Sequence, residues 1–321
     1  MASAPASAAT AAVHHDTARA AVPTTAISTC SLRALESLKP AGERLFSDPC
    51  ATLLCGEDAL SGEQQSKWIQ ATSQSLDFWV DFLATRTRWI DDMVTMARPE
   101  QLVILGAGLD SRAYRLEILR GASVYEVDFA EVLEAKAALL AEQVPLAQFR
   151  PLHGNLGAEE EAWVQILMTA GFKPGQKSTW LLEGLTGYLT EVELGRLFKR
   201  VATLAAPGSR LIATFVGKEA NKTSMHRYVV ADEVQVASLL STFGWVGAEV
   251  FSSSAVARLY GRTSHIPEEY PYFLSASSRG ETSHAHGHEG DANDDDEGAA
   301  EKKRKKGRGA ATADMDDLAD Q

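Results

Sequence analysis

Two short apolar runs on either side of a glycine turn constrain the fold of this chain more than any other feature. The runs at residues 101–106 and 122–127 have the length and composition of buried strands, and a helix is expected between them at residues 111–119. Strand, helix and strand in this order form the unit of a parallel sheet, because parallel neighbours need a long crossover connection. The sequence therefore predicts an α/β fold.

The same alternation of strand-length apolar runs and helical periodicity continues as far as residue 276. It predicts strands at 148–152, 179–182, 209–215, 246–251 and 272–276, and helices at 66–97, 131–143, 160–170, 190–204 and 232–243. Thr190 and Glu193 have the spacing of a capping box at the start of the helix 190–204. Such alternation is typical of a mostly parallel, doubly wound sheet, in which ligands bind beyond the carboxyl ends of the strands.

The composition changes at both ends of the chain and predicts three zones. Residues 1–23 are biased toward Ala and Ser, which indicates a disordered leader. Residues 279–321 consist of acidic and basic runs that bury too little apolar surface to fold, which indicates a disordered charged tail. The folded unit, residues 24–278, is expected to contain a helical cap over about 24–99 and a sheet core over about 100–278.

Charge and cysteine content limit the partners and the compartment. The formal net charge of -12 argues against nucleic acid as a partner, and no apolar run approaches the roughly 20 residues that a membrane helix needs. The three cysteines form no CxxC pair, and no histidine stands at zinc-ligand spacing, so no metal is expected. Sparse reduced cysteines favour a cytoplasmic location. The basic run Lys302–Lys306 resembles a nuclear localisation signal, which makes nuclear entry the second reading.

The glycine turn and a following acid predict the cofactor. Gly106 and Gly108 lie where the first strand turns into a helix, and Asp128 ends the second strand about 20 residues later, a spacing suited to ribose hydroxyls. A dinucleotide-binding turn would have a third glycine where this chain has Ser111. Asp110 places negative charge where pyrophosphate would lie and favours the cationic sulfonium and amino group of S-adenosylmethionine. A nicotinamide-dependent reductase is therefore the poorer alternative.

Two further charged positions are expected near this turn. Glu183 directly follows the predicted strand 179–182, at a place where a buried carboxylate needs a charged partner; a surface acid is the alternative interpretation. Arg86 and Arg88 lie on the helix that precedes the first strand. Because Arg88 stands four residues before Asp92, the spacing of an intrahelical ion pair, Arg86 is preferred for bidentate binding of the methionine carboxylate.

These motifs and their order resemble a known family. The segments that carry the resemblance are RTRWIDD at 86–92, VILGAGLDSRAYRL at 103–116, YEVDF at 125–129, LEGL at 182–185, FGW at 243–245 and LYGR at 259–262. They resemble the leucine carboxyl methyltransferase-like family, in particular the branch named "putative S-adenosyl-L-methionine-dependent methyltransferases". The resemblance covers about residues 24–278 and implies a Rossmann-like class I methyltransferase fold with an N-terminal helical extension.

The resemblance also implies cofactor contacts for the residues that match the motifs. These are Arg86 at the methionine carboxylate, the turn Gly106, Ala107 and Gly108 with Asp110 beneath the cofactor, Asp128 at the ribose, Glu183 at the methionine amino group, and Asn155 with Leu156 at the adenine. At the last position the family has an Asp-Leu pair, and asparagine keeps an acceptor oxygen but loses the charge. Thr186 and Gly187 replace a bulkier apolar pair, which changes the expected shape of the pocket.

The predicted activity is methyl transfer from S-adenosyl-L-methionine to a carboxylate or hydroxyl oxygen of a small molecule. The alternatives are a protein C-terminal carboxyl methyltransferase and a catalytically silent cofactor-binding scaffold. Arg112 and Tyr188 are expected to line the acceptor site. A carboxylate acceptor is already ionised near neutral pH, whereas a hydroxyl is helped by a base. No catalytic residue is assigned, since a single histidine is more often structural; the candidates for a base are His153, His226 and His265.

Overall fold

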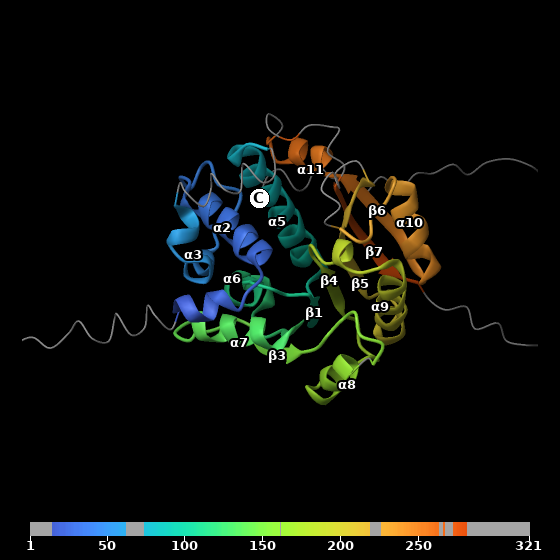
Figure 1. Ribbon diagram of the computed structural model, residues 1–321. Coiled ribbons are helices and arrows are strands. Elements are labelled where there is room, and N and C mark those ends of the chain that lie inside the picture. The colour runs from blue at the N-terminus through green and yellow to red at the C-terminus, as the bar shows by residue number, and fades with distance from the viewer. Residues whose placement is uncertain are drawn as a thin grey trace, which may run out of the picture. The chain divides into compact units, whose positions relative to one another are not determined.

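A seven-stranded sheet lies at the centre of the described part of the chain. The computed structural model describes residues 15–61, 74–160, 162–218, 226–262, 266 and 272–280. The strands are β1 (Gln101–Leu105), β2 (Ser123–Asp128), β3 (Gln148–His153), β4 (Thr179–Leu182), β5 (Arg210–Val216), β6 (Trp245–Ser252) and β7 (Tyr272–Arg279). Their order is β3-β2-β1-β4-β5-β7-β6, and β7 is antiparallel to both neighbours while the pairings from β3 to β5 are parallel. The predicted α/β fold with a mostly parallel sheet is confirmed (Figure 1).

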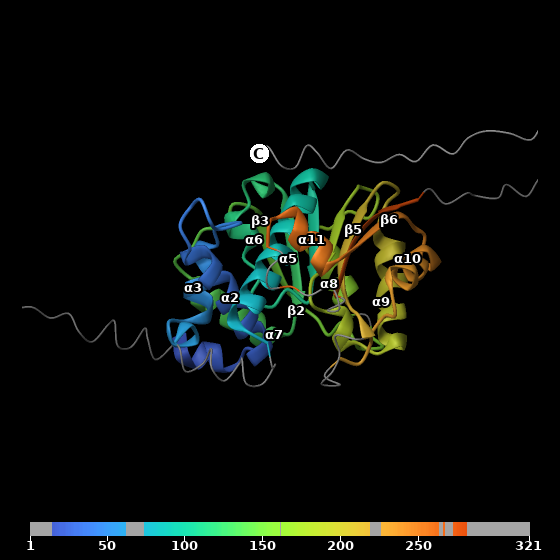
Figure 2. The same ribbon diagram turned by 90° about the horizontal axis from the view of Figure 1, so that it is seen from above.

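Helices cover both faces of this sheet (Figures 1 and 2). The helices are α2 (Thr24–Leu38), α3 (Pro49–Cys55), α5 (Leu76–Ala97), α6 (Arg112–Arg115), α7 (Ala130–Leu139), α8 (Ala162–Thr169), α9 (Glu191–Leu204), α10 (Glu233–Thr242) and α11 (Ser253–Leu259), with 3₁₀ turns η1 (Asp58–Leu60), η2 (Glu117–Leu119) and η3 (Thr186–Tyr188). In β1, Val103 and Leu105 pack on the side of α8, α9 and α10. Leu102 and Ile104 pack on the opposite side, with α5, α6 and α11. This alternation is the doubly wound arrangement that the apolar runs predict.

The predicted N-terminal helical extension is present as α2, α3, η1 and α5. Helix α3 starts at Asp48, whose side chain accepts hydrogen bonds from the amides of Cys50 and Ala51, and Pro49 occupies the first helical position. Asp as N-cap followed by proline is a strong helix start. Buried residues of α2 and α3 then pack against Ala135 and Leu139 of α7, which attaches the cap to the sheet domain.

Residues 15–23, which the sequence analysis assigns to the leader, belong to the described part of the chain. Residues 15–20 are helical, and Val22 is buried. Arg19 donates from Nη2 to the carbonyl of Leu53 at 2.9 Å and from Nε to that of Leu54 at 3.3 Å. These carbonyls lie at the C-terminal end of α3, where helices leave acceptors unsatisfied. This long-range contact orders a segment whose Ala-rich composition indicates disorder; residues 1–14 lie outside the described residues.

Other boundaries differ by smaller amounts. The helix predicted at 111–119 is divided into α6 and η2, because Leu116 between them has an extended conformation. The helix predicted from residue 66 begins at Leu76, and residues 62–73 lie outside the described residues. Helix α11 follows β6 without having been predicted, and β7 continues to Arg279, one residue into the predicted tail. Among the described residues, no helix combines the length and apolar character that a membrane span requires.

Candidate functional site

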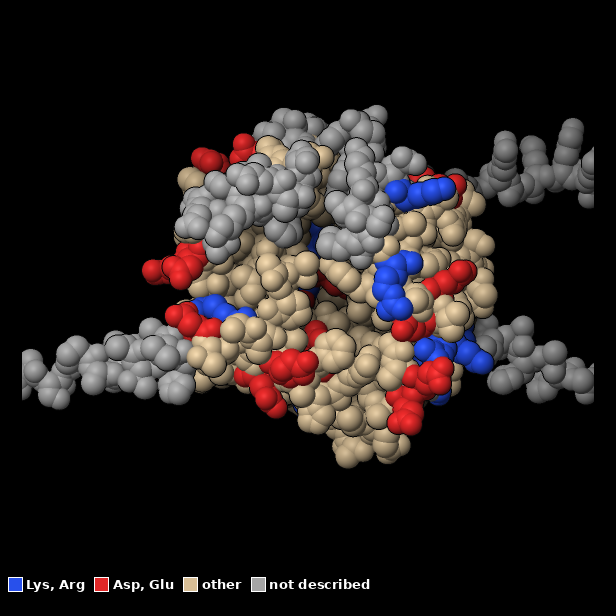
Figure 3. All heavy atoms as spheres, in the orientation of Figure 1, with Lys and Arg blue, Asp and Glu red and all other residues tan. Residues whose placement is uncertain are grey.

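A cavity of about 410 Å³ lies at the carboxyl ends of β1, β2 and β4. Its walls come from α2, α5, the loops after these three strands, the end of β5 and the segment that begins at residue 226. The face of the molecule in Figure 3 is hollowed near its centre, and charged side chains are visible within the hollow. This is the place where the topology of a doubly wound sheet leaves a crevice, and the volume is in the range of small-molecule sites.

The turn after β1 forms the floor of the cavity. The amides of Gly106 and Ala107 donate to the carbonyl of Val127 at 2.8 and 3.3 Å. Gly106 has a φ of 69°, and a Cβ added there would lie 2.9 Å from Cδ1 of Leu185. Glycine is therefore needed both for the backbone conformation and for the close approach of a neighbouring side chain. Gly108, with a φ of 50°, continues the same turn.

Asp128 lies at the end of β2 on the wall of the cavity. Its Oδ2 accepts from the amide of Gly108 at 2.6 Å, and its Oδ1 accepts from the amide of Phe129 at 2.7 Å. Burial raises the pKa of this carboxyl above its ordinary value, against the lowering effect of the two amide hydrogen bonds. The two bonds hold the carboxylate in one orientation beside the glycine turn, which suits an acceptor of hydroxyl hydrogen bonds.

Glu183 joins the cavity to a buried ion-pair network. Arg86 donates from Nε to Oε1 of Glu183 at 2.9 Å, and Arg112 donates from Nη1 to Oε2 at 2.7 Å. Burial alone would raise the pKa of Glu183, but the guanidinium groups of Arg112 and Arg86 outweigh it and lower the pKa to about 2. The carboxylate is therefore ionised at physiological pH, as expected for a buried acid with charged partners.

Arg86 itself lines the cavity and keeps part of its guanidinium available. Its Nε bond to Glu183 is the hydrogen bond that it makes within the described ranges, so Nη1 and Nη2 have no partner there. Arg88, two residues further along α5, donates from Nε to both carboxylate oxygens of Asp92, at 2.9 and 3.0 Å. The predicted intrahelical pair of Arg88 is confirmed, and Arg86 is the arginine that faces the site.

Arg112 lies behind the cavity wall rather than on it. It is almost fully buried, and it donates from Nε to Asp91 at 2.7 Å and from its backbone amide to Asp110 at 2.7 Å; Nη1 also contacts Asp110. The predicted contact of Arg112 with the acceptor is thus replaced by a role in holding Glu183. Arg112 also forms an ion pair with Asp110, which compensates the charge of that carboxylate. Asp110 therefore lines the cavity with its carboxylate already paired.

The predicted adenine pair is not brought to this cavity. Asn155 is exposed, and its Oδ1 accepts from the amide of Gly157 at 3.0 Å, so it stabilises its own loop. Leu156 packs against the core on the side of α8 and α9. Phe129, which is 48% exposed, lines the cavity directly beside Asp128. The sequence contains a signal for this cavity residue, because Phe129 directly follows Asp128, the acid predicted to bind the ribose.

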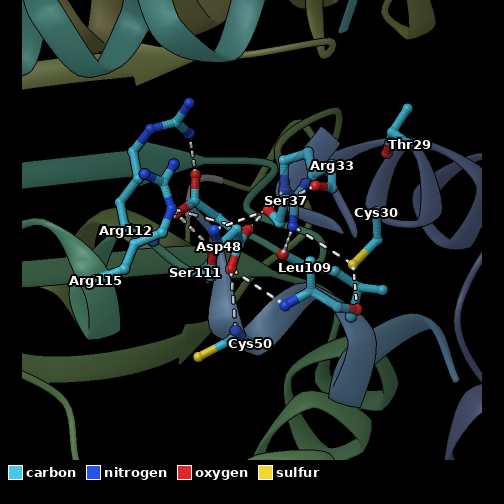
Figure 4. Close-up of polar contacts among 12 residues, drawn as sticks. Thr29, Cys30, Arg33, Ser37, Asp48, Cys50, Leu109, Ser111, Arg112 and Arg115 are labelled. Atoms are coloured by element: carbon cyan, nitrogen blue, oxygen red, sulfur yellow. Dashed lines mark hydrogen bonds and ion pairs between the residues drawn. The ribbon is translucent and has the colours of Figure 1, made fainter. Parts of the chain in front are cut away.

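Helix α2 contributes residues that sequence reasoning missed. Thr29 and Arg33 line the cavity, and Arg33 donates to Asp48 at 3.0 Å and to the carbonyl of Leu109 at 2.6 Å. The hydroxyl of Ser111 donates to the same Asp48 at 2.6 Å (Figure 4). Burial would raise the pKa of Asp48, but Arg33 and Arg115 lower it. The N-terminal helical extension is therefore bound to the glycine turn through an ionised, buried carboxylate. The sequence marks Asp48 only as a helix start, through the proline that follows it.

Tyr188 and His226 form another part of the cavity wall. Their ring centroids lie 5.5 Å apart with an angle of 59° between the planes. A Cβ added at Gly187 would lie 2.7 Å from Cδ2 of His226, so glycine is needed for this contact. Tyr188 is 40% exposed, and burial lowers the pKa of His226. Of the other candidate bases, His153 is exposed at the end of β3 and does not line the cavity, and His265 lies outside the described residues.

Comparisons with known proteins show what the chain is similar to. Residues 26–202 match the family model described as leucine carboxyl methyltransferase. A "putative S-adenosyl-L-methionine-dependent methyltransferase" of Mycobacterium leprae is 41% identical over 145 residues, which is 44% of this chain and 47% of that protein. A protein of the same name from Parafrankia sp. is 32% identical over 286 residues, 82% of this chain and 89% of its own.

Solved structures extend the comparison to the fold. The crystal structure of a protein named "putative methyltransferase" from Thermobifida fusca YX matches with a TM-score of 0.54 and 16% sequence identity, and the match covers 81% of this chain and 96% of that one. At this level of identity the match shows a shared fold.

Proposed function

The chain belongs to the leucine carboxyl methyltransferase family and is an S-adenosylmethionine-dependent methyltransferase; we propose that it methylates an oxygen atom of a small-molecule acceptor. The observation that carries the proposal is one cavity lined by two unlike groups of residues. The Arg86–Glu183 pair and the glycine turn form the charged group, which we assign as the donor end. Tyr188 and His226 belong to the less polar group, which we assign as the acceptor end.

The residues of the donor end fit the charged groups of the cofactor. We place the methionine carboxylate at the unpartnered nitrogens of Arg86, and the methionine ammonium near the ionised Glu183. Asp128 accepts from the ribose hydroxyls, and the turn Gly106, Ala107 and Gly108, with Asp110, lies beneath the cofactor. Phe129 offers an apolar surface beside Asp128, while adenine contact by Asn155 and Leu156 stays a prediction.

Methyl transfer requires the protein mainly to position the two reactants. When bound, S-adenosylmethionine supplies a methyl group that is activated by its attachment to a sulfonium. Methyl transfer is an in-line displacement, so the chain contributes by aligning the acceptor oxygen with that methyl and by excluding water. The buried pairs of Glu183 keep its carboxylate charged and in place, which keeps the donor in one orientation.

The alternative is a protein C-terminal carboxyl methyltransferase, which the description of the family favours. A C-terminal carboxylate would need a cation at the acceptor end. The described residues that line the cavity include two arginines, Arg33 and Arg86. Arg33 is paired with Asp48, and we assign the unpartnered nitrogens of Arg86 to the methionine carboxylate. We therefore prefer a small molecule, and we keep the peptide as an outcome of the test.

Calorimetry and a labelled methyl donor test this proposal. Titration with S-adenosylhomocysteine should show binding, and titration with NADH should show none. Incubation with methyl-labelled S-adenosylmethionine and a panel of hydroxyl, carboxyl and peptide acceptors should then place the label on a small molecule. Binding of NADH without S-adenosylhomocysteine would overturn the cofactor assignment. Label found only on a peptide C-terminus would favour the alternative, and cofactor binding without turnover on any acceptor would indicate a scaffold.

A further inference from the structure

The acceptor end of the cavity contains no formally charged side chain among the residues that the structure describes. Leu185, Gly187, Tyr188, Val216 and His226 form this end. A carboxylate placed here would lose its hydration without gaining a cation, which is costly. A neutral acceptor with a flat apolar body fits these walls, because the rings of Tyr188 and His226 offer aromatic faces.

His226 is held at this end by its neighbours in the chain. The amide of Arg227 donates to the carbonyl of Gly187 at 2.7 Å, and the amide of Tyr228 makes a longer bond to the same carbonyl. Further along, Val230 pairs with the end of β5 through its bond to the carbonyl of Val216 at 2.9 Å. The segment is thus bound to η3 at residues 227 and 228 and to β5 at residue 230. These backbone hydrogen bonds, and the absence of a side chain at Gly187, fix the position of the imidazole.

The surroundings of His226 favour its neutral form. Burial lowers the pKa of His226. The phenol of Tyr188 is in ring contact with His226, and the side chain of the neighbouring Arg227 is paired with Glu193 at 3.2 Å. A neutral imidazole near the working pH is the form that accepts a proton.

We propose that His226 is the general base of the reaction and that the acceptor is the hydroxyl of a small aromatic molecule, a phenol or naphthol. This inference rests on the proposed methyltransferase function and narrows its substrate class. His226 takes the hydroxyl proton while the acceptor oxygen forms its bond to the methyl carbon. The carbon–sulfur bond breaks, and its electron pair stays on sulfur. The positive charge thereby passes from the sulfonium to the imidazolium, which releases its proton to water.

A matched pair of acceptors tests the substrate class. Naphthol and naphthoic acid have the same ring system and differ in the hydroxyl or carboxyl group. With methyl-labelled donor, the full-length enzyme should methylate naphthol and not naphthoic acid. Label on naphthoic acid, or on a peptide with a free C-terminal leucine, overturns the inference while the methyltransferase assignment stands. Failure to bind S-adenosylhomocysteine overturns the proposed function itself, so the two failures are distinguishable.

Variants of His226 test the base. His226→Gln keeps a polar side chain of similar reach but cannot accept the proton, so kcat on naphthol should fall by about 100-fold or more. The affinity for S-adenosylhomocysteine should stay within about threefold, and the acidic limb of the kcat–pH profile should disappear. His153→Gln, an exposed histidine outside the cavity, is the matched control and should leave both quantities unchanged. A His226→Gln enzyme with full activity and an unchanged pH profile overturns the assignment.

A binding measurement covers the case in which neither acceptor turns over. In the complex with S-adenosylhomocysteine, the imidazole NMR signal of His226 should shift when naphthol is added and should shift less with naphthoate. A signal that ignores naphthol, or that responds more strongly to naphthoate, overturns the proposal without any measurement of activity.

Discussion

The two ends of the cavity are built in different ways. At the donor end, Glu183 is bound by Arg86 and Arg112, and Arg112 is bound in turn by Asp91, so the charges compensate one another inside the protein. At the acceptor end, Tyr188 and His226 are placed by backbone bonds and by a glycine, and they remain partly exposed. The difference indicates that the donor end suits a ligand of fixed charge. The acceptor end instead selects its ligand by shape and by the ability to give a proton to His226.

The largest expected effect comes from removing the central charge of the donor end. Glu183→Gln would leave two buried guanidinium groups without their shared carboxylate, which should cost about 3–5 kcal/mol of unfolding free energy. Binding of S-adenosylhomocysteine should be lost as well. Urea unfolding and calorimetry measure the two effects. Glu233→Gln, at an exposed position in the first turn of α10, should change stability by less than about 0.5 kcal/mol. Equal effects of the two variants would show that the ion pairs of Glu183 contribute little.

A second carboxylate, Glu126 of β2, has one cationic partner in the described part of the chain where Glu183 has two, and its pKa can be compared with that of Glu183. It is fully buried and receives one hydrogen bond, from Lys136 at 2.5 Å, while its Oε1 has no partner among the described residues. Burial raises its pKa to about 7 in spite of Lys136, whereas the pKa of Glu183 is lowered to about 2. Glu126 within β2 and Glu183 directly after β4 thus have pKa shifts of opposite sign.

The sign of each shift predicts a different pH window. The folded protein binds the Glu126 proton more tightly than the unfolded chain does, so its contribution to stability is lost as pH rises from about 4.5 to about 7. The slope should reach at most about 1.4 kcal/mol per pH unit, and Glu126→Gln should flatten it in urea unfolding curves measured across this window. The contribution of Glu183 is present above about pH 4.5 and is lost as pH falls toward 2. Stability of the natural protein that does not change across the Glu126 window would contradict the raised pKa.

Local patterns predicted much of the fold because the forces behind them act over short distances in the chain. The strand Thr179–Leu182 has its predicted bounds, since it is a short apolar run. The capping box of Thr190 and Glu193 is confirmed, because both groups lie within one helical turn. The ordered helix around Arg19 was missed, since its carbonyl partners lie more than thirty residues away in the sequence.

The same distinction applies to the candidate site. Arg86, Glu183 and the glycine turn belong to motifs, and the cavity brings them together as expected. Arg33 and its partner Asp48 could not be found from spacing, because the bond of Asp48 to Ser111 spans 63 residues and forms only when the cap packs on the turn. Local spacing also does not reveal whether an arginine such as Arg112 faces the ligand or supports another charge.

Substitution of the two neighbouring arginines of α5 separates ligand binding from helix stability. Arg86→Lys removes the planar group that holds Glu183 and faces the cavity, so affinity for S-adenosylhomocysteine should fall by about 10- to 100-fold. Arg88→Lys can keep its ion pair with Asp92, outside the cavity, and should change the affinity by less than about threefold. Calorimetry on both variants measures this difference. A larger loss in Arg88→Lys would mean that the wrong arginine has been assigned to the methionine carboxylate.

The smallest effect is expected from the glycine turn, where strain and contact can be separated. Gly106 and Gly121 both have positive φ, 69° and 79°, so alanine at either should cost about 1–2 kcal/mol of stability. A Cβ at Gly121 would meet no atom within 4 Å, whereas at Gly106 it would lie 2.9 Å from Leu185, which lines the same cavity. Gly106→Ala should therefore also weaken S-adenosylhomocysteine binding by about tenfold, or 1.4 kcal/mol, while Gly121→Ala should leave it unchanged. Unfolding curves and calorimetry on the two variants give both quantities. If both variants bind equally well, the turn matters for its backbone conformation alone, and the contact between Gly106 and Leu185 does not connect the two ends of the cavity.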